Sequence, residues 1–171
     1  MKKLLIFLLV LLSACKGETT PESGAVEGAE AASVKSGTAV VTMEGATHEL
    51  KNINWATSLV KAAPGELQLS LAQDDNPVSL NFIVEDAALQ ANGAKVYTFP
   101  EAKNADGAID LNFLNTSRKG VAMQQRVVFS EGSLEIQELT EHSLKMTFKG
   151  AGHPLMTQDT FPIEGTIDIK F

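Results

Sequence analysis

Apolar and polar residues alternate along most of the chain after residue 36. Residues 67–71 place leucine at every second position, and residues 78–84 alternate in the same way with Val, Leu, Phe and Val. Successive side chains of a strand point to opposite faces, so each run predicts a strand with one buried face. The sequence Asp-Asp-Asn-Pro at 74–77 is typical of a turn. Together these segments predict a β-hairpin.

The same alternation predicts about ten short strands in all. The other candidates are residues 38–44, 47–53, 95–99, 108–114, 126–130, 134–136, 144–148 and 162–171. Two short helices are expected at residues 55–62 and 85–91.

The predicted fold class is therefore all-β. Strands with one apolar and one polar face are typical of antiparallel sheets that pack as a sandwich or close into a barrel. The inward-facing residues are bulky Leu, Ile and Phe, as a filled core requires, whereas a barrel that holds a ligand more often has small and polar residues inside. We expect an antiparallel β-sandwich, with a closed or partly open antiparallel barrel as the alternative.

The first fifteen residues follow a different pattern. Lys2 and Lys3 precede an uninterrupted apolar run at 4–12, and two small residues follow it. Nine apolar residues at about 1.5 Å each cover roughly 14 Å of helix, which is well short of the ~30 Å hydrocarbon core of a bilayer. A basic start, a short apolar run and small residues are typical of a signal peptide, and we do not expect a permanent transmembrane helix.

This segment ends with a recognisable motif. Its last four residues are Leu12, Ser13, Ala14 and Cys15. The motif resembles the lipobox of bacterial lipoproteins, in which the cysteine becomes the first residue of the mature chain and carries acyl chains such as palmitate. The resemblance implies that residues 1–14 are cleaved, that Cys15 is lipidated and that the protein is held in a bacterial cell envelope. By resemblance to the sorting rules of bacteria with two membranes, Lys16 implies the outer membrane.

Two further segments follow the motif. Residues 15–36 are almost all small, polar or acidic, and too little apolar side chain is present to offset the entropy lost on folding. A flexible tether of this length spans about 25 Å. Residues 37–171 are enough for one β domain with a core of its own.

Charge and cysteine content limit the partners and the source of stability. The chain has 14 Lys and Arg against 21 Asp and Glu, and removal of Lys2 and Lys3 changes the formal net charge from −7 to −9. An acidic protein is repelled by nucleic acid and by anionic membrane surfaces, so attachment to a membrane must come from the acyl chains. With the only cysteine lipidated, no disulfide is expected and the core must supply the stability.

One segment partly matches the ligand pattern of a calcium-binding loop. Asn104, Asp106 and Asp110 occupy the third, fifth and ninth positions of an EF-hand-like loop. Ala102 and Phe113 stand at the first and twelfth positions, where carboxylates belong. We expect a turn before a strand, and no metal site.

The remaining motifs give little support for catalysis. His48, His142 and His153 have no partner at the spacing of zinc ligands, and no nucleophile elbow of the form G-x-S-x-G occurs. Trp55 and Tyr97 are expected to lie in the core. We expect a protein that is not an enzyme and that needs no cofactor.

Two long loops are the candidates for recognition. The first, at 115–126, contains Arg118 and Lys119, which concentrate positive charge in an acidic domain and suit an acidic partner. The second, at 150–161, contains Leu155 and Met156, and it either folds back over one end of the domain or presents an apolar patch.

The sequence thus leads to three functional hypotheses. The first is a lipid-anchored, non-catalytic binding or surface-interaction module of the cell envelope. The second is a carrier of a small apolar ligand inside a barrel or an open sandwich. The third is an envelope hydrolase of unrecognised type. The expected partners are the membrane, through the acyl chains, and an envelope protein or a small apolar ligand.

Overall fold

The computed structural model describes residues 34–89, 94–104 and 108–171. The predicted lipobox with Cys15, the segment expected to be cleaved and most of the expected tether lie outside the described residues, as does Asp106. Within the described part, no helix has the length and apolar character needed to cross a bilayer.

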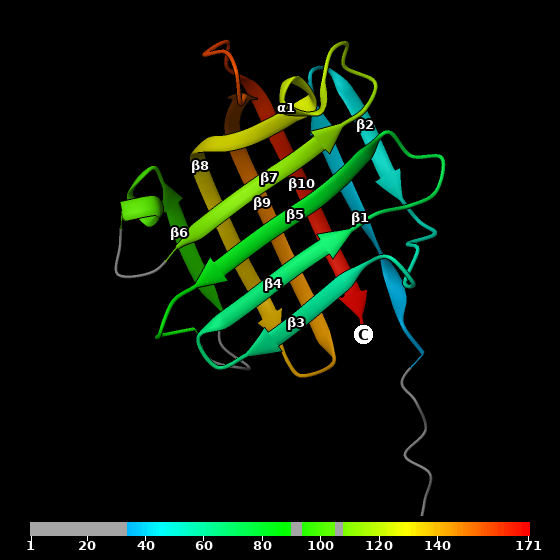
Figure 1. Ribbon diagram of the computed structural model, residues 1–171. Helices are drawn as coiled ribbons and strands as arrows, with labels where there is room; N and C mark the ends of the chain where they lie inside the picture. Colours follow the sequence, from blue (N-terminus) through cyan, green and yellow to red (C-terminus); the bar gives the residue numbers. More distant parts are fainter. Residues whose placement is uncertain (1–33, 90–93, 105–107) are drawn as a thin grey trace, which may run out of the picture. The chain divides into compact units, whose positions relative to one another are not determined.

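Ten antiparallel strands make up the described domain, which confirms the all-β class (Figure 1). The strands are β1 (Ser36–Met43), β2 (Ala46–Leu50), β3 (Leu59–Ala63), β4 (Glu66–Leu71), β5 (Val78–Glu85), β6 (Lys95–Phe99), β7 (Ile109–Asn115), β8 (Arg126–Leu139), β9 (Ser143–Pro154) and β10 (Phe161–Lys170). The short helical elements are η1 (Glu101–Asn104) and α1 (Ala122–Gln125).

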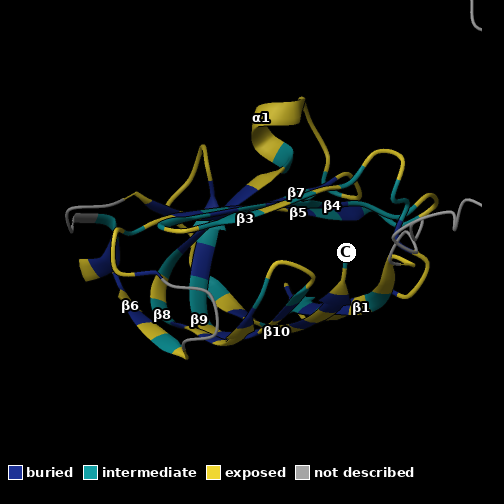
Figure 2. Ribbon diagram, turned by 90° about the horizontal axis from the view of Figure 1, so that it is seen from below, coloured by how far each residue is buried: buried dark blue, intermediate teal, exposed yellow. Residues whose placement is uncertain are grey.

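The strands form one continuous sheet in the order β2-β1-β10-β9-β8-β7-β5-β4-β3, and β6 pairs with β8 beside this path. The sheet curls so that two layers face each other (Figure 2). One layer holds β3, β4, β5 and β7, and the other holds β6, β8, β9, β10 and β1. The fold therefore combines the facing layers of a sandwich with the continuity of a partly open barrel.

The layers separate at a bulge in β8. Residues 126–128 of β8 pair with β7, whereas residues 132–136 of the same edge pair with β6. The register with β9 shifts between Phe129 and Glu131, and Gly132 follows with a φ of 118°. A Cβ on the facing Gly150 would lie 1.9 Å from the Glu131 carbonyl oxygen, so the close approach of the two backbones requires glycine.

Apolar side chains from both layers fill the interior in a single cluster. At its centre five phenylalanine rings pack with centroids 5.1 to 6.2 Å apart, mostly edge to face. These are Phe82, Phe99, Phe113, Phe129 and Phe148. The bulky interior that the alternation predicts is present.

Several local predictions need correction. The helix expected at 55–62 is wrong, because the chain makes turns at 55–57 and then forms β3. The second expected helix is also absent from its described part, since Glu85 ends β5 and a turn follows. The strands expected at 126–130 and 134–136 are parts of the single strand β8, which continues through its bulge.

The two large aromatic residues differ in burial. Tyr97 is buried, as predicted. Trp55 is only half-buried and packs against the edge of the core. The amino group of Lys35 lies 6.0 Å from the centre of its ring, at the outer limit of a cation–π contact.

Candidate binding site

Three connections meet at one end of the domain (Figure 1). They are the β1–β2 turn at residues 44–45, the β7–β8 connection with α1 at residues 116–125, and the β9–β10 loop at residues 155–160. The β9–β10 loop begins beside the end of the β7–β8 connection, because the Leu155 N–H donates at 2.9 Å to the carbonyl oxygen of Arg126, the first residue of β8. We call this surface, from the turn to the β9–β10 loop and including Arg126, the loop end.

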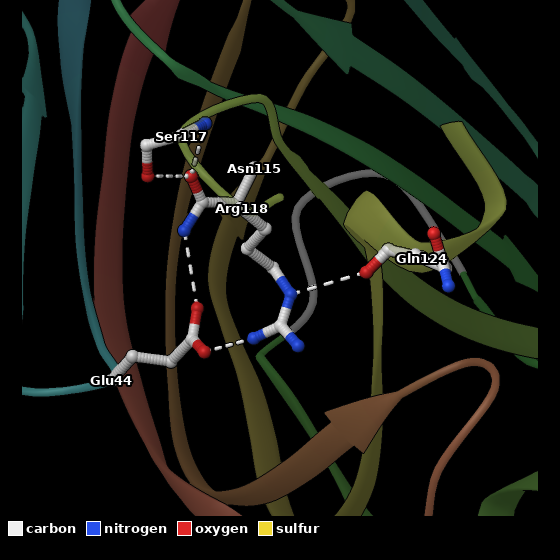
Figure 3. Close-up of polar contacts among 5 residues, drawn as sticks. All are labelled: Glu44, Asn115, Ser117, Arg118 and Gln124. Atoms are coloured by element: carbon white, nitrogen blue, oxygen red, sulfur yellow. Dashed lines mark hydrogen bonds and ion pairs between the residues drawn. The ribbon is translucent and has the colours of Figure 1, made fainter. Parts of the chain in front are cut away.

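Arg118 connects the first two of these segments (Figure 3). Its guanidinium group forms an ion pair with the Glu44 carboxylate, and its Nε donates to the Gln124 carbonyl oxygen at 3.1 Å. The two charged side chains are 24% and 29% exposed, so the pair is largely shielded from water. Arg118, which the sequence marks as a partner contact, therefore has a structural partner in Glu44.

Asn115 completes this polar cluster. It is only 4% exposed, and its Nδ2 donates to Glu44 Oε2 at 3.1 Å. Its Oδ1 accepts hydrogen bonds from the Ser117 amide at 3.1 Å and from the Ser117 hydroxyl at 2.6 Å. Buried polar groups are stable when they are paired in this way, and the cluster fixes the start of the β7–β8 connection against the β1–β2 turn.

The Arg118→Ala variant tests this structural role. We expect a cost of about 1 kcal/mol in the free energy of unfolding, as for a partly exposed ion pair. We also expect faster amide hydrogen exchange in residues 116–125, with no change in β9 and β10. Lys119→Ala is the matched control, and it should leave exchange unchanged. Equal exchange in the Arg118→Ala variant and the wild type would show that the ion pair does not hold the connection.

Lys119 differs from its neighbour. It is exposed, and the ion pairs formed among residues 34–89, 94–104 and 108–171 do not include it. It lines a cleft of about 500 Å³ between the β1–β2 hairpin and the β7–β8 connection, together with His48 and Ser117. The sequence prediction that Lys119 is available to a partner is compatible with this position.

A groove lies on the other side of the β7–β8 connection, where α1 projects from the outer face of the sheet (Figure 2). Its volume is about 320 Å³. The strand register places Ser70, Asn81 and Asn112 in one row across its floor. Met123 and Arg126 form part of its wall, so the groove combines neutral polar groups, an apolar side chain and one positive charge.

Large apolar side chains are exposed on both loops of the loop end. Val121 is 68% exposed and Met123 54%, and in the neighbouring loop Leu155 is 37% and Met156 60% exposed. The second recognition loop is shorter than predicted, because β9 continues to Pro154. The sequence predicts each loop as a separate recognition candidate. It does not predict that the loops lie together, because their proximity depends on the pairing of β8 with β9.

The other sequence candidates lie apart from the loop end or from one another. Asp110, from the calcium-like segment, is 3.9 Å from the Lys103 amino group. His153 Nδ1 lies 2.9 Å from the carbonyl oxygen of Pro154. His142 is in the β8–β9 turn. No group of three His, Cys, Asp or Glu side chains suited to a metal ion occurs in the described part of the chain.

A second polar cluster lies where β5 ends and β6 begins. Lys95 forms an ion pair with Asp86, and its amino group lies 5.4 Å from the centre of the Tyr97 ring. The hydrogen bond from Lys95 is the main cause that lowers the pKa of Asp86. The buried Tyr97 hydroxyl has no hydrogen bond of good geometry among the described residues. Burial is the main cause that raises the pKa of Tyr97, and the nearby Asp86 carboxylate is the second cause.

The lowered pKa of Asp86 predicts a pH-dependent contribution to stability. A carboxyl whose pKa is lower in the folded state stabilises the fold above its ordinary value of 3.8, and this contribution is lost as the pH falls through the lowered pKa. We expect Asp86→Asn to cost about 1 kcal/mol at pH 7. The difference from the wild type should shrink below pH 3.8. Urea unfolding of the variant and the wild type at pH 7 and below pH 3.8 measures this difference in stability. A difference that does not change with pH would contradict the lowered pKa of Asp86.

Comparison with known proteins gives no relative. No protein-family model, no curated protein and no solved structure matches this chain.

Proposed function

We propose that the protein is a lipid-anchored, non-catalytic binding module of a bacterial cell envelope. In this proposal, Cys15 carries the acyl chains that attach the protein to the outer membrane, residues 16–36 are the tether, and the β domain binds another envelope component. The loop end is the binding surface.

The observation that carries the proposal is the position of the exposed apolar side chains. Seven large apolar residues are exposed in the described part, and four of them belong to the loop end: Val121, Met123, Leu155 and Met156. Gathered apolar exposure of this kind marks interaction sites in soluble domains. A surface with this character supports a binding role.

The place where the tether joins the domain also supports it. β1 begins at Ser36, where the tether ends, and its eight residues end at Met43 beside the β1–β2 turn. Eight residues of strand span roughly 25 Å. The loop end therefore lies one full strand away from the residue at which the tether joins the domain.

The interior favours a binding module over a ligand carrier. The phenylalanine cluster and the surrounding apolar residues occupy the space between the layers. Ligand pockets have volumes of about 300 Å³ or more, and a carrier that holds its ligand inside the curled sheet would need such a cavity between the two layers. The hollows at the loop end lie on the surface instead.

Site-specific photocrosslinking in the native cells tests the proposal. A photoreactive amino acid is placed in the full chain at Met123, at Met156 or, as the matched control, at Val96, which is 61% exposed on β6. We expect the two loop-end positions to give the same discrete adduct and Val96 to give none. A random set of neighbours from all three positions would reject the loop end as a binding surface.

A further inference from the structure

We infer that the loop end binds a protein segment in which acidic and apolar side chains alternate. This inference rests on the proposed function, since it takes the loop end as the binding surface and adds the chemistry of the partner. Three properties of the loop end support this inference: its positive charge, its two hollows and its flexible methionine side chains.

The charge of the loop end is opposite to that of the chain. Its segments contain three cationic side chains and two carboxylates, whereas the whole chain has a net charge of −7. Glu44 is paired with Arg118, and the second carboxylate is the exposed Asp159. Lys119 and Arg126 are both exposed, and the described ion pairs include neither of them. Complementary charge therefore favours a partner with carboxylates.

The two free cations lie beside different hollows. Lys119 lines the cleft of about 500 Å³, and Arg126 lines the groove of about 320 Å³. Val121 and Met123 lie between them in the sequence and are exposed. A segment that crosses this connection meets a cation, an apolar stretch and a second cation in turn, which suits alternating acidic and apolar side chains.

Methionine makes the apolar part adaptable. Met123 and Met156 are flexible and polarisable, and side chains of this type are common on surfaces that bind peptide segments. The hollows accept protruding side chains, whereas a flat lipid surface would leave them unfilled. The negative charge of the rest of the chain also opposes approach to an anionic bilayer. A protein segment is the favoured occupant.

Methyl NMR of the purified full chain in lipid nanodiscs tests the inference, with ¹³C-labelled methionine methyl groups. Met123 and Met156 report on the loop end, and the fully buried Met146 of β9 serves as the internal control. The probes are a six-residue peptide of alternating glutamate and leucine, its lysine and leucine counterpart, and vesicles of phosphatidylethanolamine and phosphatidylglycerol at a ratio of 7:3. We expect only the acidic peptide to shift the two loop-end signals.

Charge reversal locates the interaction. Lys119→Glu combined with Arg126→Glu is expected to weaken binding of the acidic peptide about tenfold. The matched control, Lys35→Glu combined with Lys170→Glu, makes the same change in net charge at the opposite end of the paired strands β1 and β10. It should leave the affinity unchanged.

Three results would overturn the inference. They are no shift with the acidic peptide, equal shifts with the lysine peptide, and broadening of the loop-end signals by the vesicles in place of the peptide. If the crosslinks of the native cells map to the loop end while the titration shows no preference for the acidic peptide, this inference fails and the proposed function stands.

Discussion

Cys15→Ser is expected to abolish incorporation of labelled palmitate and to remove the protein from the outer-membrane fraction. Each methylene buried in a bilayer contributes about 0.8 kcal/mol, so the acyl chains supply nearly all of the membrane affinity of such a protein. The acidic chain offers no compensating electrostatic attraction. Metabolic labelling with palmitate, followed by separation of the membrane fractions, measures both effects.

The control for this experiment changes the same motif but keeps the Cys15 sulfur at which acylation is proposed. Ser13→Ala keeps a small residue two positions before Cys15, and it should preserve both labelling and fractionation. Palmitate labelling that persists in the Cys15→Ser variant would contradict the proposed anchor. An undiminished amount of the variant protein in the outer-membrane fraction would also contradict it.

Phe148→Ala is expected to have the largest effect on folding, with a loss of about 3 to 5 kcal/mol in the free energy of unfolding. The Phe148 ring lies 5.5 Å from that of Phe82, 5.6 Å from Phe113 and 6.2 Å from Phe129, so it joins the two layers of the sheet. Its removal leaves a cavity that the surrounding strands cannot fill. Typical domains are stable by 5 to 15 kcal/mol, and the variant should be close to unfolding.

Urea titration followed by the fluorescence of the chain's only tryptophan, Trp55, measures this loss. Phe161→Ala is the matched control, because Phe161 is only half-buried at the edge of the same core. We expect it to cost less than half as much. Equal losses in the two variants would show that the phenylalanine cluster is not the centre of the fold.

The strands that the sequence predicts best are those with one buried and one exposed face. β4, β5 and β10 follow the predicted segments to within about two residues, because their buried side chains all fall on alternate positions. β3 was missed for the opposite reason. It is an edge strand with no fully buried residue, and its exposed Leu59 and half-buried Val60 break the period of two.

β8 shows a second limit of local patterns. The shift between Phe129 and Glu131 adds a residue to one strand, so the alternation changes face at this point. A change of face followed by Gly132 and Ser133 resembles the end of one strand and the start of another. Only the pairing with β9, which is distant in the sequence, shows that the strand continues.

The loop end was predictable in its parts but not as a surface. Clustered charge identified Lys119, and apolar residues in a polar segment identified Leu155 and Met156. The ion pair that engages Arg118 joins residues 74 positions apart, and the contact between the two loops follows from strand register. Long-range pairing of this kind leaves no trace in local periodicity.

The central claim is that the loop end is covered by a partner in the cell, and methionine oxidation tests it most directly. Intact cells and the purified full chain are treated with hydrogen peroxide, and sulfoxide at each methionine is measured by mass spectrometry. We predict that Met123 and Met156 oxidise several times more slowly in cells than in the purified protein, while the buried Met43 and Met146 resist oxidation in both. Equal oxidation rates of Met123 and Met156 in cells and in the purified protein would contradict the claim.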